Sequence, residues 1–196
     1  DHRQIALQIG LLIDREVDGA GLDGIGDRGR KVERAEIDLA RLTHFIERSQ
    51  RLYGYPHFIC DTGGSICEWV DGDDPADPIL TELSRHCLLV YIEGSEAHTA
   101  ELVRRFDRAP KPMAYQPAFL SRVWEEYLRK NNVMEAEVDP DAFIRWTYAQ
   151  ALAHRQPRYE AMAKWGVRVS ADEVARATDA ASFETLIATA IDRRRA

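Results

Sequence analysis

A short apolar segment that ends in an aspartate and two glycines is the part of this sequence best suited to chemistry. Residues 57–61 are predicted to form a strand that ends at Asp61, and Thr62, Gly63 and Gly64 open a polar loop after it. Open α/β sheets carry their ligand sites outside the carboxyl ends of the strands. Glycines let the backbone approach a ligand closely and direct N–H groups at an anion. The structural alternative is a tight strand-to-helix turn that only needs glycine.

A local basic cluster lies further along the chain. Arg104, Arg105, Arg108 and Lys111 stand at the end of a predicted helix and in the proline-rich loop beyond it. Guanidinium forks match pairs of phosphate oxygens, and a neighbouring lysine adds a point charge. The alternative is a set of solvated cations that the helix dipole favours at a helix C-terminus.

A third candidate is the segment from His154 to Tyr159, which contains Arg155 and Pro157. It is predicted to join two helices and offers a planar guanidinium and an aromatic ring. The alternative is a helix break forced by Pro157, with Tyr159 packed in the core.

The pattern of the middle of the chain predicts the α/β fold class, with a parallel sheet flanked by helices. Residues 79–85 are predicted as a short helix, and the apolar run 87–92 as a strand buried on both faces. Ser95 then caps a helix that runs to about Phe106. The order strand, helix, strand, helix is typical of βαβ units.

Residues nearer the N-terminus give weaker signals. Residues 1–17 fit a helix or a strand about equally, and residues 32–52 fit a long amphipathic helix. Between them, residues 18–31 carry five glycines and six charges, a composition that predicts a mobile loop.

From Pro117 onward the sequence is strongly helical. Helices are predicted over 118–129, 140–153, 158–165 and 182–193. Residues 167–169 are predicted to form a short strand, and Ser170 with Glu173 a capping box for the helix after it.

Bulk properties restrict the class of protein. With 196 residues and 45% hydrophobic composition, we expect a single domain, 1–196. The unpaired cysteine spacing and the lack of a long apolar run or a leader segment predict a cytoplasmic protein. A formal net charge of -7 argues against duplex nucleic acid as a partner, and no apolar run predicts a membrane span. The three cysteines do not suggest a disulfide framework, and the scattered histidines suggest no metal site.

Taken together, these motifs resemble the small P-loop kinases, with shikimate kinases as the nearest comparison. The strand ending at Tyr91-Ile92, the helix after it and the basic segment 104–112 are similar to the strand, helix and arginine-bearing lid of these enzymes. Residues 61–64 are similar to their glycine-rich substrate loop, and residues 155–159 to an Arg-x-Pro-x-Tyr turn against adenine. The resemblance covers about 55–193, with 117–150 as a helical insertion.

The resemblance implies ATP and Mg²⁺ as cofactors, and a small molecule as the phosphoryl acceptor. It implies that Asp61 is a magnesium-shell carboxylate or the base that takes the acceptor's proton. The groups near the acceptor and the phosphates would be Thr62, Gly63, Gly64, Arg104, Arg105, Arg108 and Lys111. Arg155 and Pro157 would flank the adenine.

One departure from the family is large. The chain contains no Gly-x-x-x-x-Gly-Lys-Ser/Thr motif, and the Gly-x-Gly-x-x-Gly pattern over 24–29 is interpreted as a linker. Ser65 also stands where the substrate loop of the family has a third glycine. We therefore expect a strand, a phosphate loop and a helix ahead of Asp1. The alternative is a non-catalytic regulatory module that kept the kinase-like sheet and lost the phosphate loop.

Overall fold

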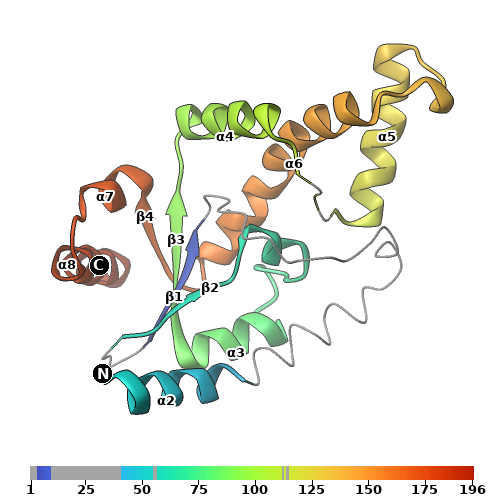
Figure 1. The fold of residues 1–196 in the computed structure, drawn as a ribbon. Coiled ribbons are helices and arrows are strands. Elements are labelled where there is room, and N and C mark those ends of the chain that lie inside the picture. Colours follow the sequence, from blue (N-terminus) through green and yellow to red (C-terminus); the bar gives the residue numbers. More distant parts are fainter. Residues whose placement is uncertain (1–3, 10–40, 55–56, 112, 114) are drawn as a thin grey trace. The chain divides into compact units, whose positions relative to one another are not determined.

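The structure is a computed structural model, and it describes residues 4–9, 41–54, 57–111, 113 and 115–196 (Figure 1). Cα packing divides the chain into two compact units, Asp1–Gly94 with Arg158–Ala196, and Ser95–Pro157. We expected a single domain with an insertion over 117–150. The second unit contains all of that range and begins before it, at Ser95.

A small parallel sheet forms the centre of the first unit. Its strands are β1 (Gln4–Ile9), β2 (Ile59–Asp61), β3 (Cys87–Glu93) and β4 (Val167–Ser170), in the order β2-β1-β3-β4. The predicted parallel sheet flanked by helices is thus confirmed. Residues 4–9, which fitted a helix or a strand equally, form a strand.

The pairing register brings the carboxyl ends of the strands to one edge of the sheet. Leu7 of β1 lies opposite Asp61 of β2, and Ile9 lies opposite Ile92 of β3. Glu93 of β3 lies opposite Ser170 of β4. Because all pairs are parallel, the chain leaves all four strands at the same edge of the sheet.

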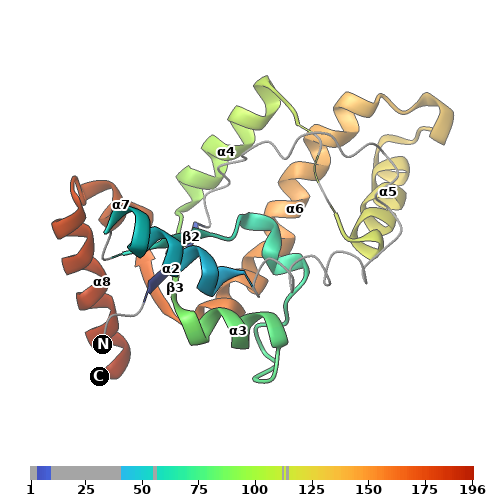
Figure 2. The same ribbon diagram turned by 60° about the horizontal axis from the view of Figure 1, so that its bottom comes forward.

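Both faces of β3 are buried, as the apolar run predicted. On one face, Leu89 and Tyr91 pack with α3 (Pro78–His86), the end of α6 (Pro140–Ala163) and α2 (Leu42–Tyr53). On the other face, Val90 and Ile92 pack with β4 and α8 (Ala180–Arg195). Figures 1 and 2 show α3 and α8 on opposite sides of the sheet.

Side-chain caps begin the helices that follow β3 and β4. Ser95 and His98 form a capping box at the start of α4 (Glu96–Arg108), and Ser170 and Glu173 form one at α7 (Ala171–Arg176). Each box satisfies N–H groups that a helix start leaves without a partner. Both predicted helix starts, at Ser95 and at Ser170, are confirmed.

The second unit is helical and has its own aromatic core. It contains α4, α5 (Pro117–Asn131), the short 3₁₀ turn η3 (Glu135–Glu137) and α6 up to Pro157. Phe119 and Val123 of α5 pack against Ala151 of α6. Phe106 of α4 stacks on Tyr148 of α6, with ring centroids 3.9 Å apart.

The predicted helix break at Pro157 is wrong, because α6 continues through it to Ala163. A proline inside a helix removes one hydrogen bond and costs about 3 kcal/mol. The carbonyl of Ala153 loses that bond. Because Ala153 and Pro157 are both exposed, water can donate a hydrogen bond to this carbonyl instead. Arg155 and Tyr159 are buried on either side of Pro157, and their packing favours one continuous helix.

Two other expectations reach beyond the part of the chain that the structure describes. The expected loop over 18–31 lies outside the described residues, as does the start of the expected helix over 32–52, of which α2 is the described part. None of the helices in the described ranges has both the length and the apolar character required to cross a membrane.

Candidate functional site at the carboxyl edge of the sheet

Asp61 and Gly63 form a tight turn at the end of β2. The N–H of Gly63 donates to Oδ1 of Asp61 at 2.9 Å, and the Asp61 side chain is exposed. Gly63 has φ 67° and ψ 154°, a backbone conformation that only glycine adopts readily. No atom lies within 4 Å of a Cβ built on Gly63, so its backbone angles alone require glycine. The hydroxyl of Thr62 is buried and has no hydrogen-bond partner among the described residues.

Tyr159 of α6 forms a hydrogen bond with Gly64, the next residue of this loop. Its hydroxyl donates to the carbonyl oxygen of Gly64 at 2.6 Å, and the thiol of Cys67 donates to the same oxygen at 3.3 Å. Gly64 begins the 3₁₀ helix η2 (Gly64–Glu68). The Tyr159 ring stacks on Tyr91 of β3, with centroids 6.2 Å apart and an interplanar angle of 21°. The loop after β2 is therefore anchored to a ring that β3 fixes.

Arg158 makes a second link between α6 and the same segment. Its Nη1 donates to the carbonyl of Cys67 at 3.1 Å and lies 3.7 Å from Oε2 of Glu68. Glu68 is 3% exposed, so its carboxylate is held away from water. A buried carboxylate needs a nearby cation to remain ionised at low cost.

The segment after η2 also packs closely on the end of α6. A Cβ on Gly72 would lie 2.5 Å from the backbone carbon of Ala161, so only glycine fits at this position. The indole N–H of Trp165 donates to the Gly72 carbonyl at 2.9 Å, and Lys164 pairs with Asp73 at 2.5 Å. Residues 64–73 thus lie along the last turns of α6.

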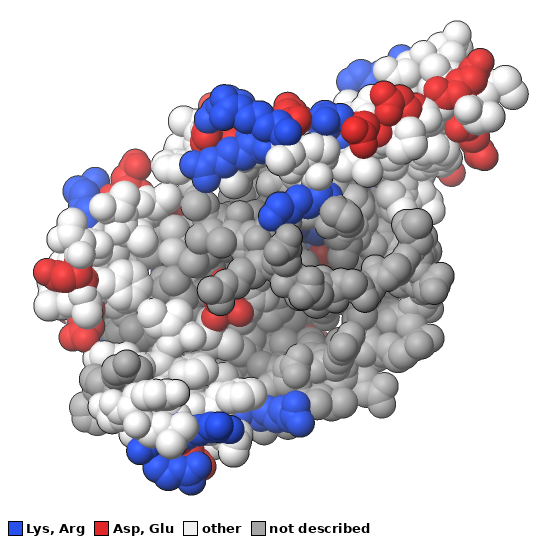
Figure 3. Space-filling model, in the orientation of Figure 1, with Lys and Arg blue, Asp and Glu red and all other residues white. Residues whose placement is uncertain are grey.

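The predicted phosphate-binding arginines belong to the second unit. Arg104 donates through Nε and Nη2 to Glu101 at 2.6 and 2.5 Å, and Arg105 donates through Nε at 2.9 Å. These bonds lower the pKa of Glu101 to about 2. Figure 3 shows Lys and Arg side chains gathered over α4, with acidic atoms among them. Arg108 and Lys111 are exposed.

Arg155 and Pro157, the residues expected beside adenine, lie inside α6. Arg155 is 0% exposed, and its guanidinium lies 5.9 Å from the Tyr115 ring centroid within the second unit. Pro157 is exposed on the same helix. The structure therefore places a buried guanidinium and an exposed proline in one helix, and forms no turn there.

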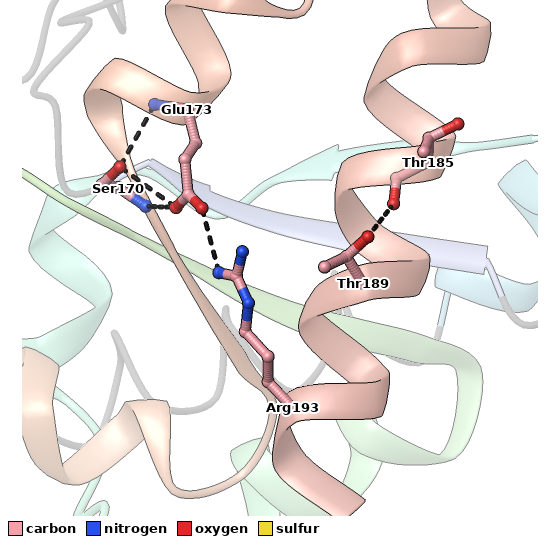
Figure 4. Close-up of polar contacts among 5 residues, drawn as sticks. All are labelled: Ser170, Glu173, Thr185, Thr189 and Arg193. Atoms are coloured by element: carbon pink, nitrogen blue, oxygen red, sulfur yellow. Dashed lines mark hydrogen bonds and ion pairs between the residues drawn. The ribbon is translucent and has the colours of Figure 1, made fainter.

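An open groove of about 550 Å³ runs along the edge strand β4. Its walls carry Arg168, which pairs with Glu93, and Arg193, which pairs with Glu173. Glu173 also accepts hydrogen bonds from the N–H and hydroxyl of Ser170 (Figure 4). The charged groups of this groove are largely engaged with one another.

Metal and thiol chemistry receive little support from the described residues. These contain no group of three or more His, Cys, Asp and Glu side chains that could hold a metal ion. Burial raises the pKa of Cys87 to about 12, and burial with the Asp61 charge raises that of Cys60. Both thiols therefore remain protonated and are poor nucleophiles.

Sequence reasoning missed Glu68, Arg158 and Tyr159 as residues of this site. Arg158 and Tyr159 were visible only as part of the segment predicted to face adenine. Glu68 carried no pattern signal, because nothing local marks a glutamate that becomes buried beside an arginine ninety positions away.

Comparisons of this chain with protein-family models, curated proteins and solved structures find no match.

Proposed function

We propose that the first unit binds a nucleotide, ATP with Mg²⁺, at the carboxyl edge of its sheet, and that the protein is an ATP-dependent phosphotransferase or ATPase of the P-loop kinase type. The phosphoryl acceptor would be a small molecule. The strand order β2-β1-β3-β4 is the observation that carries this proposal. In a doubly wound sheet of this order, ligands bind outside the strand ends where the order reverses, between β1 and β3.

The position of Asp61 suits a magnesium-dependent reaction. Asp61 ends the strand next to β1 and keeps an exposed carboxylate oxygen beyond the one bound to Gly63. Mg²⁺ in nucleotide sites takes one or two carboxylates, with waters and phosphate oxygens as its other ligands. A single exposed carboxylate therefore fits this ion, whereas a cage of several carboxylates is not needed. Mg²⁺ bound there would neutralise charge on the transferring phosphoryl group.

The basic side chains of the second unit, on α4 and just after it, are also proposed to contact phosphate. Arg104, Arg105, Arg108 and Lys111 provide guanidinium and ammonium donors for phosphate oxygens. Glu101 engages Nε and Nη2 of Arg104 and Nε of Arg105, so a phosphate has to compete with this carboxylate for those donors. Exposed pairs of this kind contribute only about 0–1 kcal/mol, so a phosphate group can compete for the arginines.

A second candidate function is a non-catalytic ligand-binding module with a kinase-like sheet. Two observations favour it. No Gly-x-x-x-x-Gly-Lys-Ser/Thr motif occurs in the sequence, and Glu101 engages both Arg104 and Arg105. Such a module would bind a nucleotide or another phosphorylated ligand without turning it over.

Substitution of Asp61 by asparagine tests the catalytic proposal. Asparagine keeps an acceptor for the Gly63 N–H but removes the charge, so the turn stays formed while Mg²⁺ loses its ligand. We expect ATP binding to the unaltered protein by calorimetry with Mg²⁺, and a loss of phosphate release of about 100-fold in Asp61→Asn. Asp192→Asn, which changes an exposed carboxylate of α8, is the matched control and should leave turnover unchanged.

The outcomes separate the two candidates. Failure of the unaltered protein to bind ATP would refute the nucleotide proposal. ATP binding without phosphate release, with or without candidate acceptors, would favour the non-catalytic module. Full turnover in Asp61→Asn would show that the Asp61 carboxylate is not required for catalysis.

A further inference from the structure

We infer that Tyr159 is a positioning residue of the candidate site, and that its hydroxyl sets the orientation of Asp61 through the backbone of Gly63 and Gly64. The inference rests on the proposed function only for the ligand that would bind there. The links themselves are contacts of the first unit.

The first link fixes Gly64. Its carbonyl oxygen accepts hydrogen bonds from the Tyr159 hydroxyl at 2.6 Å and from the Cys67 thiol at 3.3 Å. A hydroxyl bond of that length is a strong one, whereas a thiol is a weak donor. Tyr159 is therefore the main donor that fixes the plane of the Gly64–Ser65 peptide.

The second link transmits this orientation to Asp61. Gly63 has φ 67° and ψ 154°, and its N–H donates to Oδ1 of Asp61 at 2.9 Å. Glycine in this region has many alternative conformations of similar energy, so an anchor on each side is needed to select one. Asp61 on β2 supplies one anchor, and Tyr159 supplies the other.

Tyr159 is itself held in place. It is 5% exposed, it stacks on Tyr91 of β3, and the neighbouring Arg158 donates to Cys67 of the same segment. A functional side chain is held most accurately when the residues behind it are locked by packing and hydrogen bonds. The Tyr159 hydroxyl lies at the end of a rigid support and acts on a loop that contains two flexible glycines.

Tyr159→Phe removes the hydroxyl and keeps the ring, so the stack with Tyr91 remains. Tyr127→Phe is the matched control, because Tyr127 is also a buried tyrosine but belongs to the second unit. Hydrogen exchange of the ligand-free proteins should show at least tenfold faster exchange over 62–68 in Tyr159→Phe, with exchange in α8 unchanged. The Gly63 amide resonance should also move in Tyr159→Phe and stay in place in Tyr127→Phe.

Calorimetry with ATP and Mg²⁺ and a phosphate-release assay add the functional readout. We expect Tyr159→Phe to weaken ATP binding three- to tenfold, and to lower kcat more than it raises KM. Tyr127→Phe should bind ATP as the unaltered protein does. Unchanged exchange over 62–68 would overturn the inference whether or not ATP binds. Faster exchange with unchanged affinity and unchanged turnover would also overturn it, since Tyr159 would then only stabilise the loop. If the unaltered protein binds no ATP, the proposed function fails, and the exchange and the Gly63 resonance decide the inference alone.

Discussion

Gly166 and Leu89 touch so closely that no side chain fits between them. A Cβ on Gly166 would overlap the carbonyl oxygen and the Cβ of Leu89, at the place where β4 begins beside β3. Leu89 is 2% exposed and belongs to the core under α3. The absence of a side chain at Gly166 therefore lets β4 enter the sheet in register with β3.

Substitution of Gly166 by alanine should destabilise the protein strongly. The methyl group would meet backbone atoms, which cannot rotate away, so we expect a loss at the upper end of the usual 1–3 kcal/mol, or about 3 kcal/mol. Urea unfolding monitored by circular dichroism measures the change.

Gly54→Ala is the matched control, because its cost has a different origin. Gly54 caps α2 with φ 64°, and no atom lies within 4 Å of a Cβ built there. Only backbone strain opposes alanine, at about 1 kcal/mol. Gly54→Asn should cost less, since the chain already uses Asn132 with φ 52° to end α5. Equal losses for Gly166→Ala and Gly54→Ala would contradict the steric argument.

Asp77 joins the acidic loop to α3, and its removal should be costly. Its carboxylate accepts hydrogen bonds from the N–H groups of Leu80 and Asp71, both at 2.8 Å, and Asp77 is 6% exposed. Loss of a helix cap and of a second buried bond predicts about 2 kcal/mol of destabilisation in Asp77→Ala. Asp73→Ala, which removes only an exposed pair with Lys164, should cost less than about 1 kcal/mol. Indistinguishable urea midpoints for the two variants would refute this difference.

Glu173 should give the protein a measurable loss of stability in acid. Hydrogen bonds from Ser170 and the bond from Arg193 lower its pKa from 4.5 to about 2 in the folded state. Between these values the unfolded chain binds more protons than the folded one, so stability falls as pH falls through this range. The contribution of ionised Glu173 to the free energy of unfolding is fully present above pH 4.5.

The melting temperature as a function of pH tests this expectation. Glu173→Gln should melt below the unaltered protein at pH 6, and the gap should narrow progressively towards pH 2. Glu125→Gln, an exposed glutamate of α5, serves as the control and should show no such trend. A gap that stays constant down to pH 2 would show that the charge of Glu173 contributes nothing.

Local signals predicted much of the fold, because they report interactions between near neighbours. The run 87–92 is apolar without alternation and became the doubly buried β3. Ser170 and Glu173 lie three positions apart and became the capping box of α7. Residues 4–9 alternate at Ile5, Leu7 and Ile9, a strand period, but the apolar residues 11–13 that follow blurred the signal.

Long-range contacts decided what the sequence could not show. Pro157 marks a break by local rules, yet the burial of Arg155 and Tyr159 keeps α6 continuous. The candidate loop at Asp61 was visible as a local pattern, whereas its anchor at Tyr159 lies ninety-five positions away from Gly64. Contacts of that separation leave no periodic trace in a single sequence.

Release of the arginines on α4 provides the most direct test of their proposed role. Glu101 bonds Arg104 and Arg105 from positions three and four residues earlier on the helix. The hydrogen bonds from Arg104 and Arg105 lower the pKa of Glu101 to about 2, so the carboxylate is ionised at neutral pH and competes with phosphate for both arginines. Glu101→Gln removes the charge and should free both guanidinium groups for phosphate. We expect inorganic phosphate and ATP to bind three- to tenfold more tightly, with a steeper dependence on salt.

Glu82→Gln is a matched control for this change. Glu82 contacts Arg85 and His86 of α3 with the same spacing along the helix, but none of these residues belongs to the predicted site. Loss of these exposed or half-buried pairs should alter stability by about 1 kcal/mol or less, so both variants should remain folded. Tighter phosphate binding in Glu101→Gln alone would place Arg104 and Arg105 among the ligand-binding residues. Equal phosphate affinity in all three proteins would mean that these arginines are only solvated surface residues of α4. Phosphate would then be bound elsewhere or not at all.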